Sequence, residues 1–141
     1  MNITQLGTSP GALAEKMGIE LVEASADKVV ASMPVEGNTQ PYGLLHGGAS
    51  CVLAETAGSI AAMLHAMSVD PDAIAVGIEL NASHHRGVRA GRVTATAEAI
   101  HRGGTLASYE ILVVDDRQRR VCTARLACAI RPGSAISTKA S

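Results

Sequence analysis

Residues 40–59 read Gln40-Pro-Tyr-Gly-Leu-Leu-His46-Gly47-Gly48-Ala-Ser-Cys-Val-Leu-Ala-Glu55-Thr-Ala-Gly-Ser59. A loop with turn-forming residues leads to a His-Gly-Gly step, and the long run of apolar and small residues that follows predicts a helix over residues 46–67. Glu55 is the only acidic residue of that run, and no Lys or Arg accompanies it. A carboxylate buried there without a cationic neighbour costs several kcal/mol. We therefore expect Glu55 to have a chemical role.

A structural role for Glu55 is the alternative. It would require an arginine from a second protomer, because no cation lies three or four residues away on the helix.

The helix face around Glu55 consists mostly of small residues. At about 100° per residue, the positions near Glu55 are Gly48, Cys51, Val52, Gly58, Ser59 and Ala62. The opposite positions are Leu53, Ala57, Ile60 and Leu64. We expect the bulkier side to face the core. The small side either leaves space for a ligand or lets a second helix approach closely.

The start of this helix is a candidate oxyanion site. The first N–H groups of a helix have no partner within it and carry partial positive charge, and Gly47 and Gly48 have no side chain to keep a carbonyl oxygen away. Glu55 lies roughly 12 Å further along the axis, so one helix cannot place both groups on the same carbon atom. Two antiparallel helices can, and we therefore expect an obligate homodimer, alone or paired into a tetramer, with shared active sites.

The remaining sequence predicts more sheet than helix. A short helix is expected to begin at Ser9-Pro10-Gly11 and to reach Met17. The β-favouring runs are residues 19–24, 28–35, 74–83, 92–100, 106–114 and 121–130. One long helix with six antiparallel strands wrapped around it is an α+β layout. We expect one domain over residues 1–131 and a flexible tail over residues 132–141.

Composition excludes several functions. With 141 residues, a net charge of -1, two Tyr and no Phe or Trp, the chain has neither the charge nor the aromatic surface of a nucleic-acid-binding protein. Its three cysteines form no CxxC pair, and no signal peptide is visible, so we expect reduced thiols and a cytoplasmic protein. The one membrane-length segment, residues 47–67, is too rich in Gly, Ser and Ala for a membrane span, and no membrane partner is expected.

From about Met17 to Arg131 the chain resembles the hotdog-fold acyl-CoA thioesterases, specifically the 4-hydroxybenzoyl-CoA thioesterase and PaaI-like group. The residues that carry the resemblance are Gln40, His46-Gly47-Gly48, Glu55 and Ser59, with weaker matches at Asn81-Ala82-Ser83-His84 and Gly91-Arg92-Val93. The resemblance implies a hotdog fold and hydrolysis of an acyl-CoA thioester, with an aromatic acyl group preferred. It implies no cofactor, since CoA is part of the substrate.

The resemblance also implies roles for the matching residues. Glu55 would act as nucleophile or as general base, and the Gly47 N–H would stabilise the oxyanion. Gln40 and His46 would position or polarise the thioester carbonyl, and Ser59 would hold the carboxylate or a water molecule. Each has a simpler alternative: His46 as a helix cap, Ser59 as a packing residue and Gln40 as a polar loop residue.

Four residues are candidates for binding the phosphates of CoA, namely His84, Arg86, Arg89 and Arg102. Solvated charges at the sheet edge are the alternative. No metal site is predicted, because the adjacent His84 and His85 would point to opposite faces of a strand. A hotdog hydratase or dehydratase and a non-catalytic acyl-CoA-binding protein are the alternative functions. A serine hydrolase is disfavoured, because no Gly-x-Ser-x-Gly elbow is present.

Overall fold

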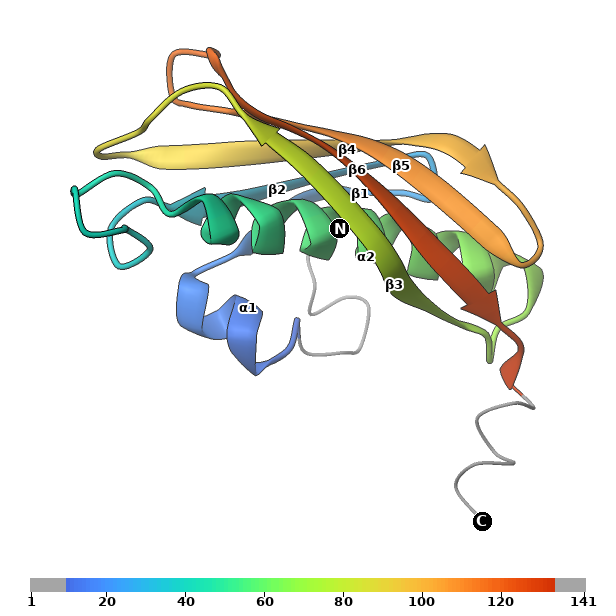
Figure 1. Ribbon diagram of the computed structural model, residues 1–141. Coiled ribbons are helices and arrows are strands. Elements are labelled where there is room, and N and C mark those ends of the chain that lie inside the picture. Colours follow the sequence, from blue (N-terminus) through green and yellow to red (C-terminus); the bar gives the residue numbers. More distant parts are fainter. Residues whose placement is uncertain (1–9, 134–141) are drawn as a thin grey trace.

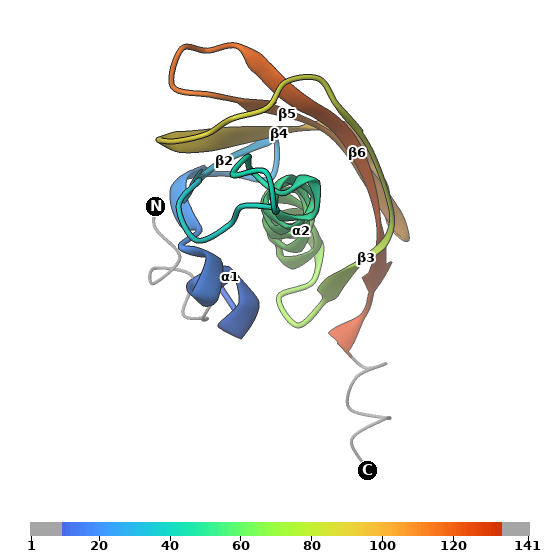
Figure 2. The same ribbon diagram turned by 60° about the vertical axis from the view of Figure 1, so that its left-hand side comes forward.

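A six-stranded antiparallel sheet curves around one long helix, α2, in the computed structural model (Figures 1 and 2). The structure describes residues 10–133, so Ser9 and the tail beyond residue 133 lie outside the described residues. The elements in chain order are α1 (Ala12–Met17), β1 (Glu20–Ala24), β2 (Lys28–Pro34), α2 (Gly47–Val69), β3 (Ile74–His84), β4 (Arg92–Arg102), β5 (Leu106–Val114) and β6 (Arg120–Arg131). The predicted α+β architecture of six strands around a central helix is confirmed.

The strand order in the sheet is β1-β2-β4-β5-β6-β3. Strands β2 and β3 are consecutive in the chain, with α2 between them, but they are not neighbours in the sheet. Strand β3 forms one edge of the sheet. Strand boundaries match the sequence pattern to within two residues, and β4 runs on to Arg102. His101, just beyond the predicted strand 92–100, is therefore part of β4 and pairs with Ser108 of β5.

Helix α2 packs on the sheet through small residues. Its buried positions are Ala49, Ser50, Leu53, Ala54, Ala57, Gly58, Ala61, Ala62, His65 and Ala66. A methyl group on Gly58 would lie 2.7 Å from Leu126 Cδ2 of β6, so the sheet approaches the helix backbone very closely there. On the side expected to face the core, Leu53 and Ala57 are fully buried and Ile60 is half-buried against the core. Leu64 is also only half-buried.

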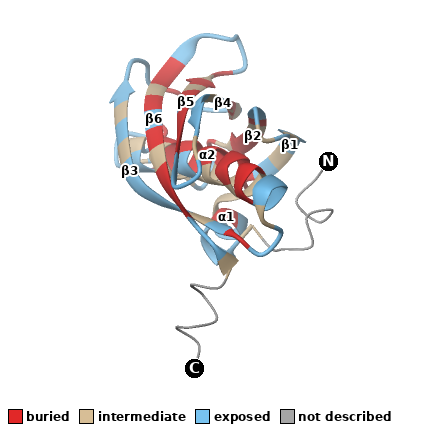
Figure 3. Cartoon of the chain, turned by 90° about the vertical axis from the view of Figure 1, so that its right-hand side faces the viewer, coloured by how far each residue is buried: buried red, intermediate tan, exposed pale blue. Residues whose placement is uncertain are grey.

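The inner face of the sheet forms the rest of the core. Alternate residues of β2, β4, β5 and β6 are buried against α2, as the period of two requires. Strand β3 differs, because none of its residues is fully buried (Figure 3). By length and composition α2 resembles a membrane span, but it is the core helix of this fold.

The loop before α2 is held in place by hydrogen bonds to three other parts of the chain. The Asn38 side-chain amide donates to the carbonyls of Met17 (2.9 Å) and Pro34 (2.8 Å), and the Leu45 N–H donates to the Val88 carbonyl (2.7 Å). The Asn38 carbonyl accepts from the His46 N–H at 2.9 Å. These bonds fix where α2 begins, and with it the candidate oxyanion site.

Candidate active site

His46 caps α2 and leaves one N–H group free. Its Nδ1 atom accepts a hydrogen bond from the Gly48 N–H at 2.8 Å, and its carbonyl accepts from Ala49 (2.9 Å) and Ser50 (3.3 Å). Gly47 is the first helical residue, and its N–H has no acceptor within residues 10–133. The cap therefore leaves the Gly47 N–H as a donor for a ligand oxygen, in the field of the helix N-terminus.

A cleft of about 420 Å³ opens beside this free N–H. Its walls are Gln40, Leu44, Leu45, Gly47, Ser50, His84, His85, Arg86, Gly87 and Val121. The His84 ring lies against Gly47, where an added methyl group would be 3.1 Å from His84 Nε2. The structure thus brings together Gln40, Gly47, His84 and Arg86, which were predicted from separate parts of the sequence.

Gln40 is oriented by its own loop. Its side-chain Oε1 accepts a hydrogen bond from the Tyr42 N–H, and its backbone N–H donates to the Leu44 carbonyl at 2.8 Å. The side-chain NH₂ has no acceptor in the part of the chain that the structure describes. Gln40 and Gly47, which both line the cleft, therefore each have a donor group without an acceptor among the described residues.

Glu55 lies on α2 outside this cleft. Its side chain is exposed in the protomer, so the expectation of a buried carboxylate is wrong for the single chain. Strand β3 is the edge of the sheet, and the β3 residue beside the Glu55 carboxylate is Gly77, which has no side chain to cover it. Glu55 has no hydrogen bond or ion pair with any residue between 10 and 133, so the expectation of a carboxylate without a cationic neighbour agrees with the structure.

The Glu55 carboxylate lies close to Gly77 of β3 and near the thiols of Cys51 and Cys128. Its Oε2 atom would be 2.9 Å from a methyl group built on Gly77 of β3. Burial raises the pKa of Cys128 to about 11, against a hydrogen bond from the Ser59 hydroxyl, and the charge of Glu55 raises it further. Burial and the same charge also raise the pKa of Cys51. These thiols therefore stay neutral at pH 7 and are not thiolate nucleophiles there.

Ser59 lies near Cys128 of β6, and its hydroxyl lowers the pKa of that thiol against the larger effect of burial. No hydrogen bond joins Ser59 to Glu55 among the described residues.

A second cleft, of about 620 Å³, lies beyond the first between the β3–β4 and β5–β6 connections. Its charged walls are Arg86, Arg89, Arg117, Arg119, Asp115 and Asp116. Asp115 forms an ion pair with Arg119 at 2.8 Å, and the Asp116 carboxylate accepts a hydrogen bond from the Arg92 backbone N–H at 3.1 Å. Four arginines against two paired aspartates leave this end of the molecule positive and suited to an anion.

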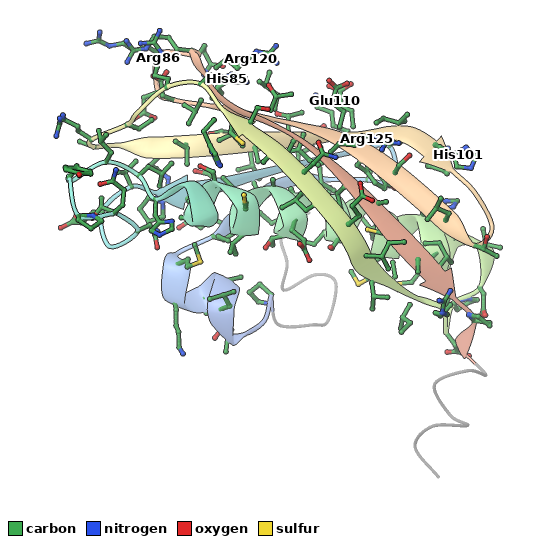
Figure 4. All side chains as sticks on the ribbon, viewed as in Figure 1. His85, Arg86, His101, Glu110, Arg120 and Arg125 are labelled. Carbon is green, nitrogen blue, oxygen red and sulfur yellow. The ribbon has the colours of Figure 1, made fainter. Side chains whose placement is uncertain are left out.

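The side chains at this end come from β3, β5–β6 and the loop between β3 and β4. Figure 4 shows His85, Arg86 and Arg120 gathered there, and His85 and Arg120 both hydrogen-bond the Thr123 hydroxyl at 2.9 Å. The structure does not bring Arg102 to them. Arg102 is the last residue of β4, forms an ion pair with Asp27 at 3.3 Å and follows His101, which lies at the opposite end of the sheet in Figure 4.

Sequence reasoning missed three of these neighbours. Ser50, Cys128 and Gly77 touch the two halves of the site, but only Gly77 had a usable signal, a glycine inside a β-favouring run. Within residues 10–133, no group of three or more His, Cys, Asp or Glu residues is arranged to hold a metal ion.

Comparison with known proteins shows the family. The thioesterase superfamily matches residues 42–122, a range that includes Gly47, Glu55 and every wall residue of the first cleft except Gln40. The chain belongs to the thioesterase superfamily. The predicted resemblance to the hotdog-fold thioesterases is thereby confirmed, and the protein is an enzyme of the hydrolase class.

This thioesterase is similar to curated proteins over most of its length. The proofreading thioesterase EntH of Cronobacter turicensis is 44% identical over 124 residues, covering 87% of this chain and 88% of that protein. The 1,4-dihydroxy-2-naphthoyl-CoA hydrolase of Listeria monocytogenes is 45% identical over 120 residues, covering 84% and 95%.

Solved structures show the same fold. A crystal structure of a mutant thioesterase from Pseudomonas aeruginosa is 42% identical to this thioesterase, with a TM-score of 0.85 and coverage of 94% and 95% of the two chains. The E. coli PaaI protein, from the phenylacetic acid degradation operon, is 25% identical, with a TM-score of 0.79 and coverage of 92% and 90%.

Proposed function

We propose that this thioesterase hydrolyses an acyl-CoA thioester to the free acid and CoA, with Glu55 as nucleophile or general base. The observation that carries the proposal is the Gly47 N–H, which has no acceptor among the described residues and lies at the wall of a cleft. Such a donor is suited to the oxygen of a thioester carbonyl, where negative charge develops during attack. The names of the two curated relatives support a thioester substrate, and one of them names a CoA ester.

The chemistry follows from the donors and the carboxylate. The thioester oxygen accepts from the Gly47 N–H and the Gln40 amide, which polarises the carbonyl carbon. Glu55 either attacks that carbon, giving a mixed anhydride that water then cleaves, or removes a proton from an attacking water molecule. In both routes CoA leaves as a thiolate, and the reaction needs no metal or further cofactor. His46 contributes by fixing the helix start.

The site is completed in a homodimer in this proposal. Strand β3 is a long edge strand whose apolar residues are exposed, with Val76 at 46% and Ile78 at 59%. Such an edge is suited to pairing with a second copy. Pairing of two β3 strands around a twofold axis sets the two α2 helices side by side, so that Glu55 of one protomer faces Gly47 of the other. A tetramer of two such dimers, and a cytoplasmic location in keeping with three free cysteines, belong to the same proposal.

We expect an aromatic acyl group as the preferred substrate. The naphthoyl-CoA hydrolase among the relatives supports this choice. The test is a panel of benzoyl-, hydroxybenzoyl-, phenylacetyl-, dihydroxynaphthoyl- and aliphatic-CoA esters, with release of the free thiol followed spectroscopically. Higher kcat/KM for the aromatic esters is the expected result. Equal or higher values for aliphatic esters would contradict the preference, and no thiol release from any ester would contradict the function.

The CoA phosphates are expected to bind Arg86 and Arg89, with His84 at the junction of the two clefts. Hydrogen bonds to charged groups contribute about 1.5–3 kcal/mol, so Arg86→Gln or Arg89→Gln is expected to raise KM about tenfold or more with little change in kcat. Arg131→Gln, at the far end of β6, is the matched control. An unchanged KM in both variants would argue against this binding site. A raised KM in Arg102→Gln would restore Arg102 to the site.

A further inference from the structure

The carboxylate of Glu55 rests on the backbone of Gly77 in β3. A methyl group built on Gly77 would lie 2.9 Å from Glu55 Oε2 and 3.3 Å from Glu55 Cδ. Real Cβ atoms essentially never come within 3.0 Å of another heavy atom. A side chain at residue 77 would therefore require the Glu55 carboxylate, which is the end of a flexible side chain, to move from its present position.

The backbone itself does not require glycine here. Gly77 is absent from the residues with positive φ, so an L-residue can adopt its conformation. Glycine inside a strand is unfavourable by roughly 0.5–1 kcal/mol relative to alanine. What remains to explain it is the close approach of another group, and the group that approaches is the Glu55 carboxylate.

The strand is irregular at the same point. Gly77 pairs with Cys128 of β6, and the register shifts between Gly77 and Glu79, so Ile78 is left without a partner. A bulge of this kind bends a strand and redirects its side chains, and such bulges are over-represented next to active sites. The β6 partner of Gly77 is Cys128, and burial raises the pKa of its thiol to about 11.

We propose that Gly77 is a positioning residue for catalysis. Because Gly77 has no side chain, the Glu55 carboxylate can lie against its backbone at the β3 edge. This inference rests on the proposed role of Glu55. In this position the carboxylate lies beside the edge strand, close to where the Gly47 N–H of the proposed partner protomer would be. A side chain at residue 77 displaces the carboxylate without removing it.

The first test is Gly77→Ala with Gly104→Ala as the matched control. The same substitution at Gly104 meets no atom within 4 Å, and Gly104 lies in the β4–β5 turn, away from the site. Since a displacement of about 1 Å can cost about 10²-fold in rate, we expect kcat of Gly77→Ala to fall by about 10- to 100-fold with KM nearly unchanged. Gly104→Ala is expected to retain wild-type kcat. Wild-type kcat in a folded Gly77→Ala variant would overturn the inference.

The second test is a double-mutant cycle with Glu55→Asp. Aspartate is shorter by one methylene group, so its carboxylate no longer reaches a methyl group at residue 77. We expect Gly77→Ala/Glu55→Asp to have the same kcat as Glu55→Asp alone, and multiplicative losses would overturn the inference. If Gly77→Ala alone does not fold, recovery of the fold in the double variant supports the contact, and failure to recover overturns it. High activity of Glu55→Gln would instead overturn the proposed function.

Discussion

Glu55→Gln is expected to abolish most thioester hydrolysis and to leave the protein folded. The amide can neither attack a thioester carbon nor accept a proton from water, so we expect kcat to fall by about 10²–10⁴-fold. The fold tolerates the change, because the Glu55 side chain is exposed in the protomer and has no hydrogen bond or ion pair within residues 10–133. Steady-state release of free CoA, together with thermal unfolding of the same sample, measures both effects.

Glu98→Gln is the control for this variant. Glu98 is exposed in β4 and pairs with Glu110 across the sheet, away from α2 and both clefts. It is expected to retain wild-type kcat. Substantial hydrolysis by Glu55→Gln would show that the carboxylate is not the reacting group.

Gly47→Pro removes the proposed oxyanion donor with little change to the helix. Proline has no N–H and is well tolerated at the first helical position. The preceding residue, His46, already has φ -66 and ψ 130, the extended conformation that a following proline requires. Loss of one oxyanion donor costs about 10²–10³-fold in kcat, and we expect a loss of this size, measured by the same thiol assay.

Gly47→Ala separates the effect of the N–H from that of the side chain. It keeps the donor but adds a methyl group 3.1 Å from His84 Nε2, so the ring must move by a few tenths of an ångström. We expect Gly47→Ala to lose much less activity than Gly47→Pro. Equal activities of the two variants would mean that the Gly47 N–H does not stabilise the transition state.

The sequence predicted the elements well because their periodicities differ. Alternation along β6 is typical of a strand, and the length of the mainly apolar and small-residue run of α2 is typical of a helix. The strands and helices appear close to their predicted bounds. The role of Gly47 as the first residue of a helix could also be predicted, since a helix start depends on residues that are adjacent in sequence. The His46 cap and the free N–H next to it depend only on neighbouring residues.

What the sequence did not predict depends on distant contacts. The degree of burial along α2 is decided by packing against the sheet, where Ala61 is fully buried while Ile60 is only half-buried against the core. Arg102 is close to Arg92 in sequence but is separated from it by the whole length of β4. Gly77 is explained only by a carboxylate that is more than twenty residues away in the chain and adjacent in space.

The shared active site is the central claim, and a mixed dimer tests it most directly. Glu55→Gln and Gly47→Pro protomers with different affinity tags are co-expressed, and the mixed dimers are purified through both tags. In a twofold dimer with shared sites, one site of each mixed dimer has both native groups and the other carries both substitutions, so about half of wild-type activity is expected. Mixed dimers no more active than the two inactive parents would contradict the claim that Glu55 acts with the Gly47 N–H of its partner.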